Sequence, residues 1–163
     1  MKKIIILLVT FFTLFNHNAF SLDWEQDTIK DEFKGSSFDY IASKFVKPNA
    51  SLKFPYMFMK ARMVRLCENL NDIIIIDFKM NPNLINGKLD TDLISHHTID
   101  IKLDGKFYKY NGEIETDSPL FIIKKGYIDR ILNSKEFVIQ FQHHAGTRHY
   151  TFDLSSMPKE CKK

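Results

Sequence analysis

Apolar and polar residues alternate along much of the chain, which is the pattern of half-buried β-strands. The clearest case is residues 97–103, in which isoleucine and leucine occupy every second position. Asp104 and Gly105 follow, and Asp-Gly between two alternating runs is a strong hairpin signal. We therefore expect residues 106–114 to return as the second strand of a hairpin.

Weaker alternation and β-branched runs predict the remaining strands. They fall at 23–30, 38–46, 57–67, 73–78, 136–141 and 148–154. Residues 73–78 are mostly isoleucine, which favours a central strand buried on both faces. Only a short polar stretch separates them from 57–67, so these two runs should form a second hairpin.

One segment has helical periodicity. Ser118-Pro119 is typical of a helix N-cap followed by proline in the first turn. The apolar positions that then share one helical face are Ile123, Tyr127, Ile128, Ile131 and Leu132. With roughly seven strands and this helix, the sequence predicts a mainly β fold: an antiparallel β-sandwich-like single domain with one helix across an end or face.

The N-terminus reads as an export signal. Lys2 and Lys3 precede an apolar run over 4–15, which is shorter than the ~20 residues that a membrane-spanning helix needs. Small residues up to Ser21 suit signal peptidase. We expect a signal peptide over 1–21 and one exported domain over 22–163, located in the periplasm or secreted, without an integral membrane span. An uncleaved N-terminal anchor is the alternative.

The chain has two cysteines, Cys67 and Cys161. An even number in an oxidising compartment predicts one disulfide, which here would tie the C-terminus to a central strand. The alternative is a pair of reactive or metal-bound thiols. The chain has no C-x-x-C spacing to favour that alternative.

Composition excludes several functional classes. Hydrophobic residues make up 44% and charged residues 26%, values that are ordinary for a globular domain and rule out wholesale disorder. The formal charge is +3, and without Lys2 and Lys3 it is near +1. Such a small balance gives no support for nucleic-acid binding. Six glycines form no phosphate-binding loop, so we expect no cofactor.

Histidines are the main candidates for metal binding. His143, His144 and His149 surround a predicted turn, and His96 and His97 could add a ligand from another loop. No H-E-x-x-H motif accompanies them. A polar hairpin tip that tolerates histidine is the simpler interpretation, and we expect no metal.

A nucleophilic triad can be combined on paper from Ser95, His96 and Asp100. No nucleophile elbow or oxyanion loop supports it. We therefore expect no catalytic residues and no enzymatic activity.

Aromatic residues are abundant, with 15 Phe, 6 Tyr and 1 Trp. Most must lie in the core. The candidates for a partner-binding surface are Trp24, Phe54, Tyr56 and Phe58. An exposed aromatic cluster of this kind marks many protein interfaces. The alternative for residues 54–58 is an ordinary entry strand of the sheet.

The order of several segments resembles a family of small exported bacterial proteins that includes the TagO-like accessory proteins of type VI secretion. The segments that carry the resemblance are Trp24-Glu25, 63–67, 73–78, 98–104, Tyr110, Asp117, 130–137, 150–154 and Cys161. The resemblance covers nearly the whole exported chain. It implies a non-enzymatic periplasmic protein and supplies no catalytic residues.

Three functions follow from these observations. We expect first a non-enzymatic periplasmic binding or accessory protein, whose partner is an envelope or secretion-machine protein. The alternative is a secreted inhibitor or immunity protein that inserts loops 79–95 and 142–147 into a toxin or wall hydrolase. The third is a metal-assisted hydrolase built on His143, His144 and His149.

Overall fold

The computed structural model describes residues 24–31, 36–67, 73–85, 87–90, 93–115, 118–123 and 126–160. The predicted signal peptide over 1–21 lies outside these residues. The strands are β1 (Trp24–Asp31), β2 (Ser36–Ser43), β3 (Ala61–Cys67), β4 (Ile73–Phe78), β5 (Lys88–Leu89), β6 (Ile94–Leu103), β7 (Lys106–Glu115), β8 (Leu120–Ile123), β9 (Glu136–His143) and β10 (Gly146–Asp153). In the part of the chain that is described, no helix is long and apolar enough to cross a membrane.

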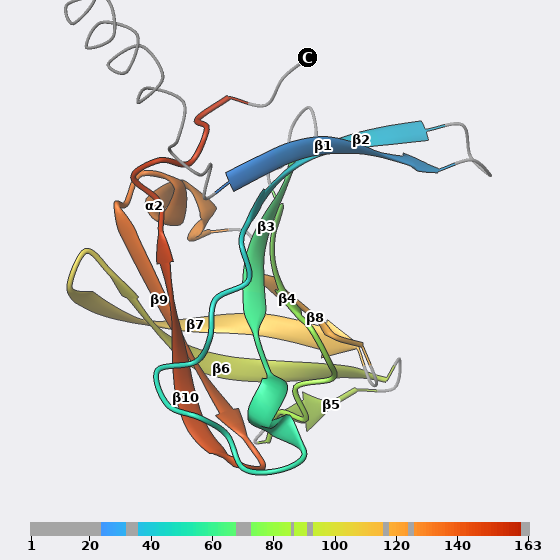
Figure 1. The fold of residues 1–163 in the computed structure, drawn as a ribbon, viewed down its shortest axis with the longest axis vertical. Helices are drawn as coiled ribbons and strands as arrows, with labels where there is room; N and C mark the ends of the chain where they lie inside the picture. The colour runs from blue at the N-terminus through green and yellow to red at the C-terminus, as the bar shows by residue number, and fades with distance from the viewer. Residues whose placement is uncertain are drawn as a thin grey trace, which may run out of the picture.

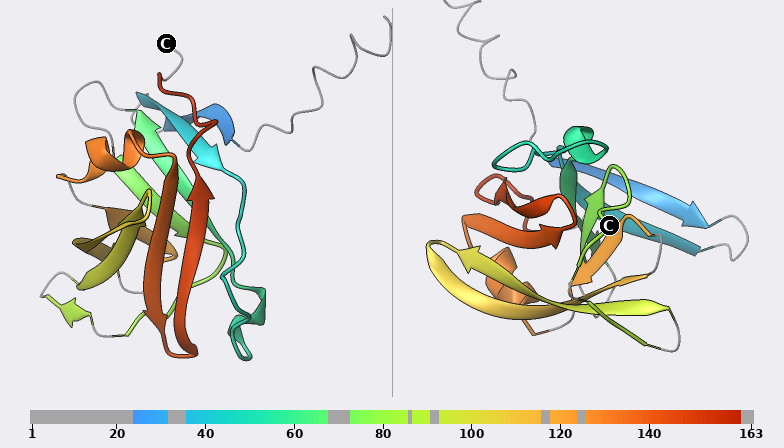
Figure 2. Two further views of the ribbon diagram at one scale, coloured as in Figure 1. Left: turned by 90° about the vertical axis from the view of Figure 1, so that its left-hand side faces the viewer. Right: turned by 90° about the horizontal axis from the view of Figure 1, so that it is seen from below.

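All ten strands belong to one antiparallel sheet, in the order β1-β2-β3-β4-β8-β7-β6-β9-β10, with β5 paired to β6. The mainly β, antiparallel prediction is confirmed, but the β-sandwich prediction is wrong. A sandwich requires two separate sheets, whereas β8 joins β4 to β7 and β6 joins β7 to β9. The single sheet curls so that β3–β4 and β9–β10, which flank β6–β7 in the strand order, both stand over one face of β6–β7 (Figures 1 and 2).

Residues 44–60, which we call the closing segment, cover the gap between β10 and β3. Val46 and Ala61 exchange two backbone hydrogen bonds, at 2.8 and 3.0 Å. Further along, the backbone N–H of Asn49 donates to the carbonyl of His149 at 3.0 Å. The Arg148 guanidinium donates to the carbonyls of residues 50 and 51, each at 2.9 Å. The edge of β10 is therefore covered, which removes a site of non-specific strand pairing.

The β6–β7 hairpin is confirmed. Asp104 and Gly105 form its turn with φ of 45° and 85°, the left-handed conformation that a tight hairpin requires. The Asp104 carboxylate also accepts hydrogen bonds from the backbone N–H groups of Lys135 and Glu136, both at 2.9 Å. These bonds lower the pKa of Asp104. The turn thus positions the start of β9 as well.

The helix predicted from Ser118-Pro119 onward is wrong in its first half. Residues 120–123 form β8, in which Phe121 and Ile123 are buried while the alternate positions face outward. This period of two fits a strand between β4 and β7 better than a helical face. Among the described residues of this segment, only the single turn α2 (Ile128–Leu132) is helical, and it buries Ile128 and Ile131.

The hairpin of β3 and β4 is confirmed, with two corrections. The strand expected from residue 57 begins at Ala61, because residues 56–58 form a 3-10 turn. β4 is central, but only one of its faces is fully buried. On its other face Asp77 accepts a hydrogen bond from Arg62 at 2.7 Å, and Arg62 also pairs with Glu25 of β1 at 3.1 Å.

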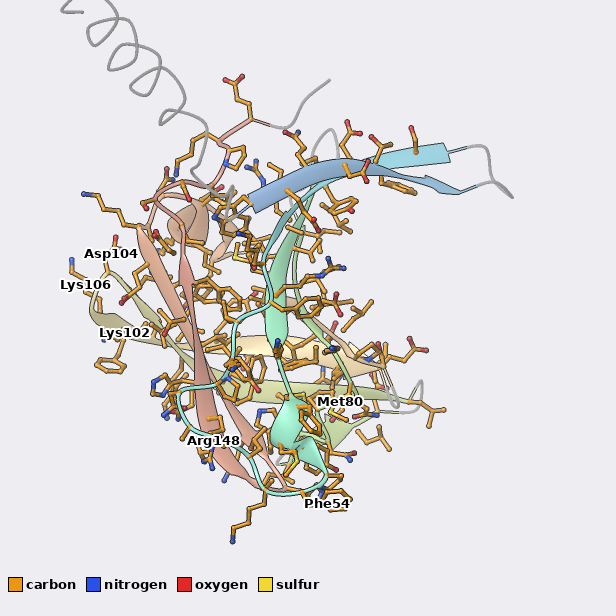
Figure 3. The ribbon with its side chains drawn as sticks, viewed as in Figure 1. Phe54, Met80, Lys102, Asp104, Lys106 and Arg148 are labelled. Carbon is orange, nitrogen blue, oxygen red and sulfur yellow. The ribbon has the colours of Figure 1, made fainter. Side chains whose placement is uncertain are left out.

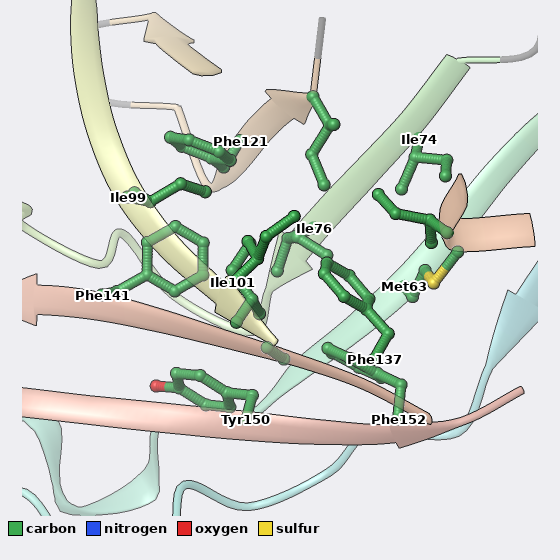
Figure 4. Close-up of a cluster of buried hydrophobic side chains, with 14 of the residues drawn as sticks. Met63, Ile74, Ile76, Ile99, Ile101, Phe121, Phe137, Phe141, Tyr150 and Phe152 are labelled. Atoms are coloured by element: carbon green, nitrogen blue, oxygen red, sulfur yellow. The ribbon is translucent and has the colours of Figure 1, made fainter. Parts of the chain in front are cut away.

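The core contains a network of aromatic rings from strands distant in sequence (Figure 4). Phe141 of β9 makes edge-to-face contacts with Phe78 and Phe121, at centroid distances of 5.1 and 4.9 Å. Phe137 stacks on Phe152 at 5.8 Å. Such pairs add about 0.5–1.5 kcal/mol each beyond their area burial. They join β4, β8, β9 and β10 and fix the curl of the sheet.

Candidate functional site

The most exposed aromatic cluster among the described residues lies on the closing segment, at the end of the molecule where Figure 3 labels Phe54. Phe54 is 83% exposed, Phe58 73% and Met57 50%. They belong to residues 53–59, which we call the aromatic turn and which include the 3-10 turn η1 (Tyr56–Phe58). Three neighbouring large apolar side chains in water form a patch of the kind that marks an interaction site.

The backbone of the aromatic turn is held in place from both ends. Leu52, which directly precedes the turn, and Met59, its last residue, are both buried in the core. Within the turn, the N–H of Tyr56 donates to the carbonyl of Lys53 and the N–H of Met59 donates to that of Tyr56, both at 2.9 Å. The Tyr56 hydroxyl accepts a hydrogen bond from the Asn83 amide. A surface fixed in this way loses little conformational entropy on binding.

The closing segment, which carries the aromatic turn, has charged residues of one sign only. Residues 44–60 contain Lys44, Lys47, Lys53 and Lys60 and no Asp or Glu. A complementary surface would therefore combine an apolar pocket with acidic groups at its rim, since opposite charges steer association and fix orientation.

The four predicted partner-binding aromatics separate into two groups. Phe54 and Phe58 are exposed, as a binding surface requires. Trp24 is only 3% exposed, and its indole N–H donates to the carbonyl of Asp153 at 3.0 Å, so it is a core residue that docks β1 on the end of β10. Tyr56 is half-buried and supports the turn. Met57 was not among the predicted binding residues, although it lies between Phe54 and Phe58 in the same apolar stretch.

His143 is a core residue. It is 1% exposed, its Nδ1 lies 2.8 Å from the carbonyl of Pro82, and its Nε2 lies 3.4 Å from the hydroxyl of Tyr150. This geometry fits the tautomer in which Nδ1–H donates to Pro82 and Nε2 accepts from Tyr150. Burial lowers the pKa of His143, so the neutral ring is favoured.

The other two histidines of the predicted metal cluster do not join His143. His144 is exposed at the hairpin end, and His149 lies opposite Gln140 on the outer face of the sheet. In the described parts of the chain, no group of three His, Cys, Asp or Glu side chains is placed to hold a metal ion. The structure thus gives the proposed hydrolase of His143, His144 and His149 no assembled site.

Ser95, His96 and Asp100 do not form a triad. Ser95 Oγ instead lies 2.9 Å from Nε2 of His97. The His97 ring also hydrogen-bonds to the backbone of Ile85. A nucleophile needs free space beside its oxygen. Here a Cβ placed on Gly87 would lie 2.0 Å from Ser95 Oγ, so the backbone at residue 87 packs directly against the hydroxyl. Ser95 and His97 thus hold the segment around Ile85 and Gly87 against β6.

His96 is engaged by two carboxylates. Its Nε2 lies 2.9 Å from Asp90 and its Nδ1 lies 2.7 Å from Glu113. Each ring nitrogen therefore faces a carboxylate oxygen. The arrangement links β7 to the loop after β5 and leaves no ring nitrogen free for a metal.

Comparisons with known proteins add no relative. No family model, no curated protein and no solved structure matches this chain. The resemblance to the TagO-like accessory proteins therefore stays a prediction, and the aromatic turn is the strongest candidate site on structural grounds.

Proposed function

We propose that this protein is a non-enzymatic binding or accessory protein of the bacterial envelope, and that the aromatic turn docks it on a partner protein. The observation that carries the proposal is the pair of exposed phenylalanines, Phe54 and Phe58, on a turn whose backbone is fixed. Interface energy is concentrated in a few large side chains that fill pockets. Two phenylalanines and Met57 are enough to supply such anchors.

A protein pocket fits this turn better than a lipid surface does. The patch consists of three apolar side chains. One whole myristoyl chain gives only marginal, reversible membrane binding, and stable attachment needs a second signal. A well-packed protein pocket gains about 2 kcal/mol or more from each anchor residue. The lysines of residues 44–60 favour a partner whose pocket has an acidic rim.

The C-terminal disulfide belongs to the same proposal, because it implies an oxidising compartment. Cys161 lies outside the described residues, so its bond to Cys67 stays a prediction. Two observations support it. The Arg65 guanidinium donates to the carbonyl of Lys159 at 3.0 Å, which places Lys159, two positions before Cys161 in the sequence, beside β3. Cys67, the one cysteine among the described residues, is not a free thiol.

Co-purification after mild crosslinking in the envelope of the source cell tests the docking proposal. The wild-type chain is compared with Phe54→Ser/Phe58→Ser and with the control Leu89→Ser, which removes an exposed apolar side chain elsewhere. We expect one partner, identified by mass, with wild type and control, and its loss with the double variant. Both phenylalanines are solvent-exposed, so circular dichroism should show an unchanged fold.

Other results would redirect the proposal. Equal recovery of the partner with the double variant would refute docking by the aromatic turn. A single toxin or wall hydrolase as the partner would identify the protein as an inhibitor instead. Sedimentation of the purified chain with anionic vesicles, lost in the double variant, would show that the turn binds lipid.

A further inference from the structure

A groove lies on the outer face of the sheet, where β6 and β9 separate. These strands pair only between residues 100–103 and 137–140. Beyond Gln140, β9 pairs instead with the segment between β4 and β5, where the N–H of Ile85 donates to the carbonyl of Gln142 at 2.8 Å. The separation leaves a hollow of about 260 Å³. A second hollow of about 260 Å³ adjoins it and shares Asp100 and Gln140. We call the two together the outer groove.

The polar side chains of the outer groove offer both donors and acceptors, and the Thr98 hydroxyl, which already donates to Oδ1 of Asn111 at 2.9 Å, can only accept. Thr98 of β6, Gln140 and Gln142 of β9 and Thr147 of β10 are exposed and line it. Amides and hydroxyls offer both functions, unlike carboxylates or ammonium groups. A ligand rich in hydroxyl groups, each also donor and acceptor, matches this set.

The charges of the outer groove balance. Asp100 and Lys102 are the only Asp, Glu, Lys or Arg side chains that line either hollow among the described residues. An anionic polymer such as nucleic acid needs a basic surface, which this is not. The groove therefore favours a neutral ligand.

An exposed aromatic ring borders the second hollow. Phe107 is 79% exposed and stands opposite Lys102 across the β6–β7 hairpin, with Lys102 Nζ 5.9 Å from its ring centroid. A sugar ring has one face of C–H groups that can lie on an aromatic ring while its hydroxyls reach polar side chains. Ligand sites combine apolar surface with a few placed polar groups in this manner.

We propose that the outer groove binds a neutral saccharide chain, with one sugar ring on Phe107 and its neighbour at Gln140 and Thr98. The Phe107 end of this site lies apart from the aromatic turn: Figure 3 shows Lys102 at the side of the molecule, near the β6–β7 turn, and Phe54 at its lower end. The inference therefore does not depend on the protein partner. It assigns the protein a second ligand, a glycan of the compartment to which it is exported.

Titration of the purified exported chain with cellotetraose, maltotetraose and chitotetraose tests this proposal, using calorimetry or amide chemical shifts. We expect saturable binding of at least one tetrasaccharide. Phe107→Ala and Gln140→Ala should each weaken it at least tenfold, and Phe54→Ala should leave it unchanged. Both groove residues are exposed, and circular dichroism checks that their variants fold.

Three results would overturn the proposal. The first is no saturable binding of any of the three sugars at millimolar concentration. The second is binding that Phe107→Ala leaves intact. The third is binding of an extended neutral peptide in the outer groove with no binding of sugar.

Discussion

Gly112 in the middle of β7 gives the sharpest test of the packing. Glycine costs a strand about 0.5–1 kcal/mol relative to alanine, so Gly112→Ala would normally stabilise the protein. Here an added Cβ would lie 2.2 Å from Cζ of Phe121 and 2.9 Å from the carbonyl oxygen of Ile122. Phe121 is fully buried and packs against Phe141, so it has little room to move.

We therefore predict that Gly112→Ala lowers the free energy of unfolding by about 2 kcal/mol, within the usual cost of overpacking a core. For a domain of this size that is a fall in Tm of about 6 °C. Thermal and urea denaturation of the purified chain measure it. Adding Phe121→Leu should recover part of the loss, because the two substitutions act on the same space.

Gly105→Ala serves as the matched control. Nothing lies within 4 Å of the position of its Cβ, but its φ is +85°. We expect a loss of about 1–2 kcal/mol from backbone strain alone, which Phe121→Leu does not recover. A Gly112→Ala protein as stable as wild type would refute the packing assigned to β7 and β8.

Three further predictions concern pH and the cysteines. Burial lowers the pKa of His143, so the unfolded chain takes up a proton more readily than the folded chain, and the free energy of unfolding should fall as pH drops below about 6.5. Urea denaturation at pH 7.5 and 5 measures this fall, which His143→Gln should reduce. An equal fall in the variant would contradict the assignment to His143. The hydrogen bonds that lower the pKa of Asp104 stabilise the fold fully above pH 3.8, the ordinary pKa of Asp, and this stabilisation is lost as pH falls through the lowered pKa. The difference in free energy of unfolding between wild type and Asp104→Asn should therefore close in acid. A difference that persists at pH 2 would show that the carboxylate charge is not its cause. Thiol titration of the denatured protein, purified without reductant from an oxidising compartment, should find no free thiol, and reduction should cost up to about 4 kcal/mol of stability. Two free thiols would disprove the bond between Cys67 and Cys161.

Local signals in the sequence predict the hairpins well. The β6–β7 hairpin follows from strict alternation around Asp104 and Gly105, and the β3–β4 hairpin from two apolar runs close in sequence. Both depend on neighbouring residues alone. Phe54 and Phe58 were candidate binding residues, but an apolar stretch next to a loop also suits an entry strand, so only the structure establishes their exposure.

Features that depend on distant partners could not be predicted in this way. Residues 120–123 suit a strand or a helix locally, and the choice is made by pairing with β4 and β7. Trp24 is buried because it donates to the carbonyl of Asp153, 129 positions along the chain. His143 belongs to the core because Pro82 and Tyr150 satisfy its ring. The single curled sheet likewise reflects pairings between remote strands.

Photo-crosslinking from inside the aromatic turn tests the central claim most directly. A photoreactive phenylalanine analogue is placed at position 58 in one protein and at position 107 in another, and each is irradiated in the envelope of the source cell. The docking proposal predicts one protein adduct from position 58 that is absent from position 107. Failure of position 58 to crosslink any protein, or the same adducts from both positions, would contradict it.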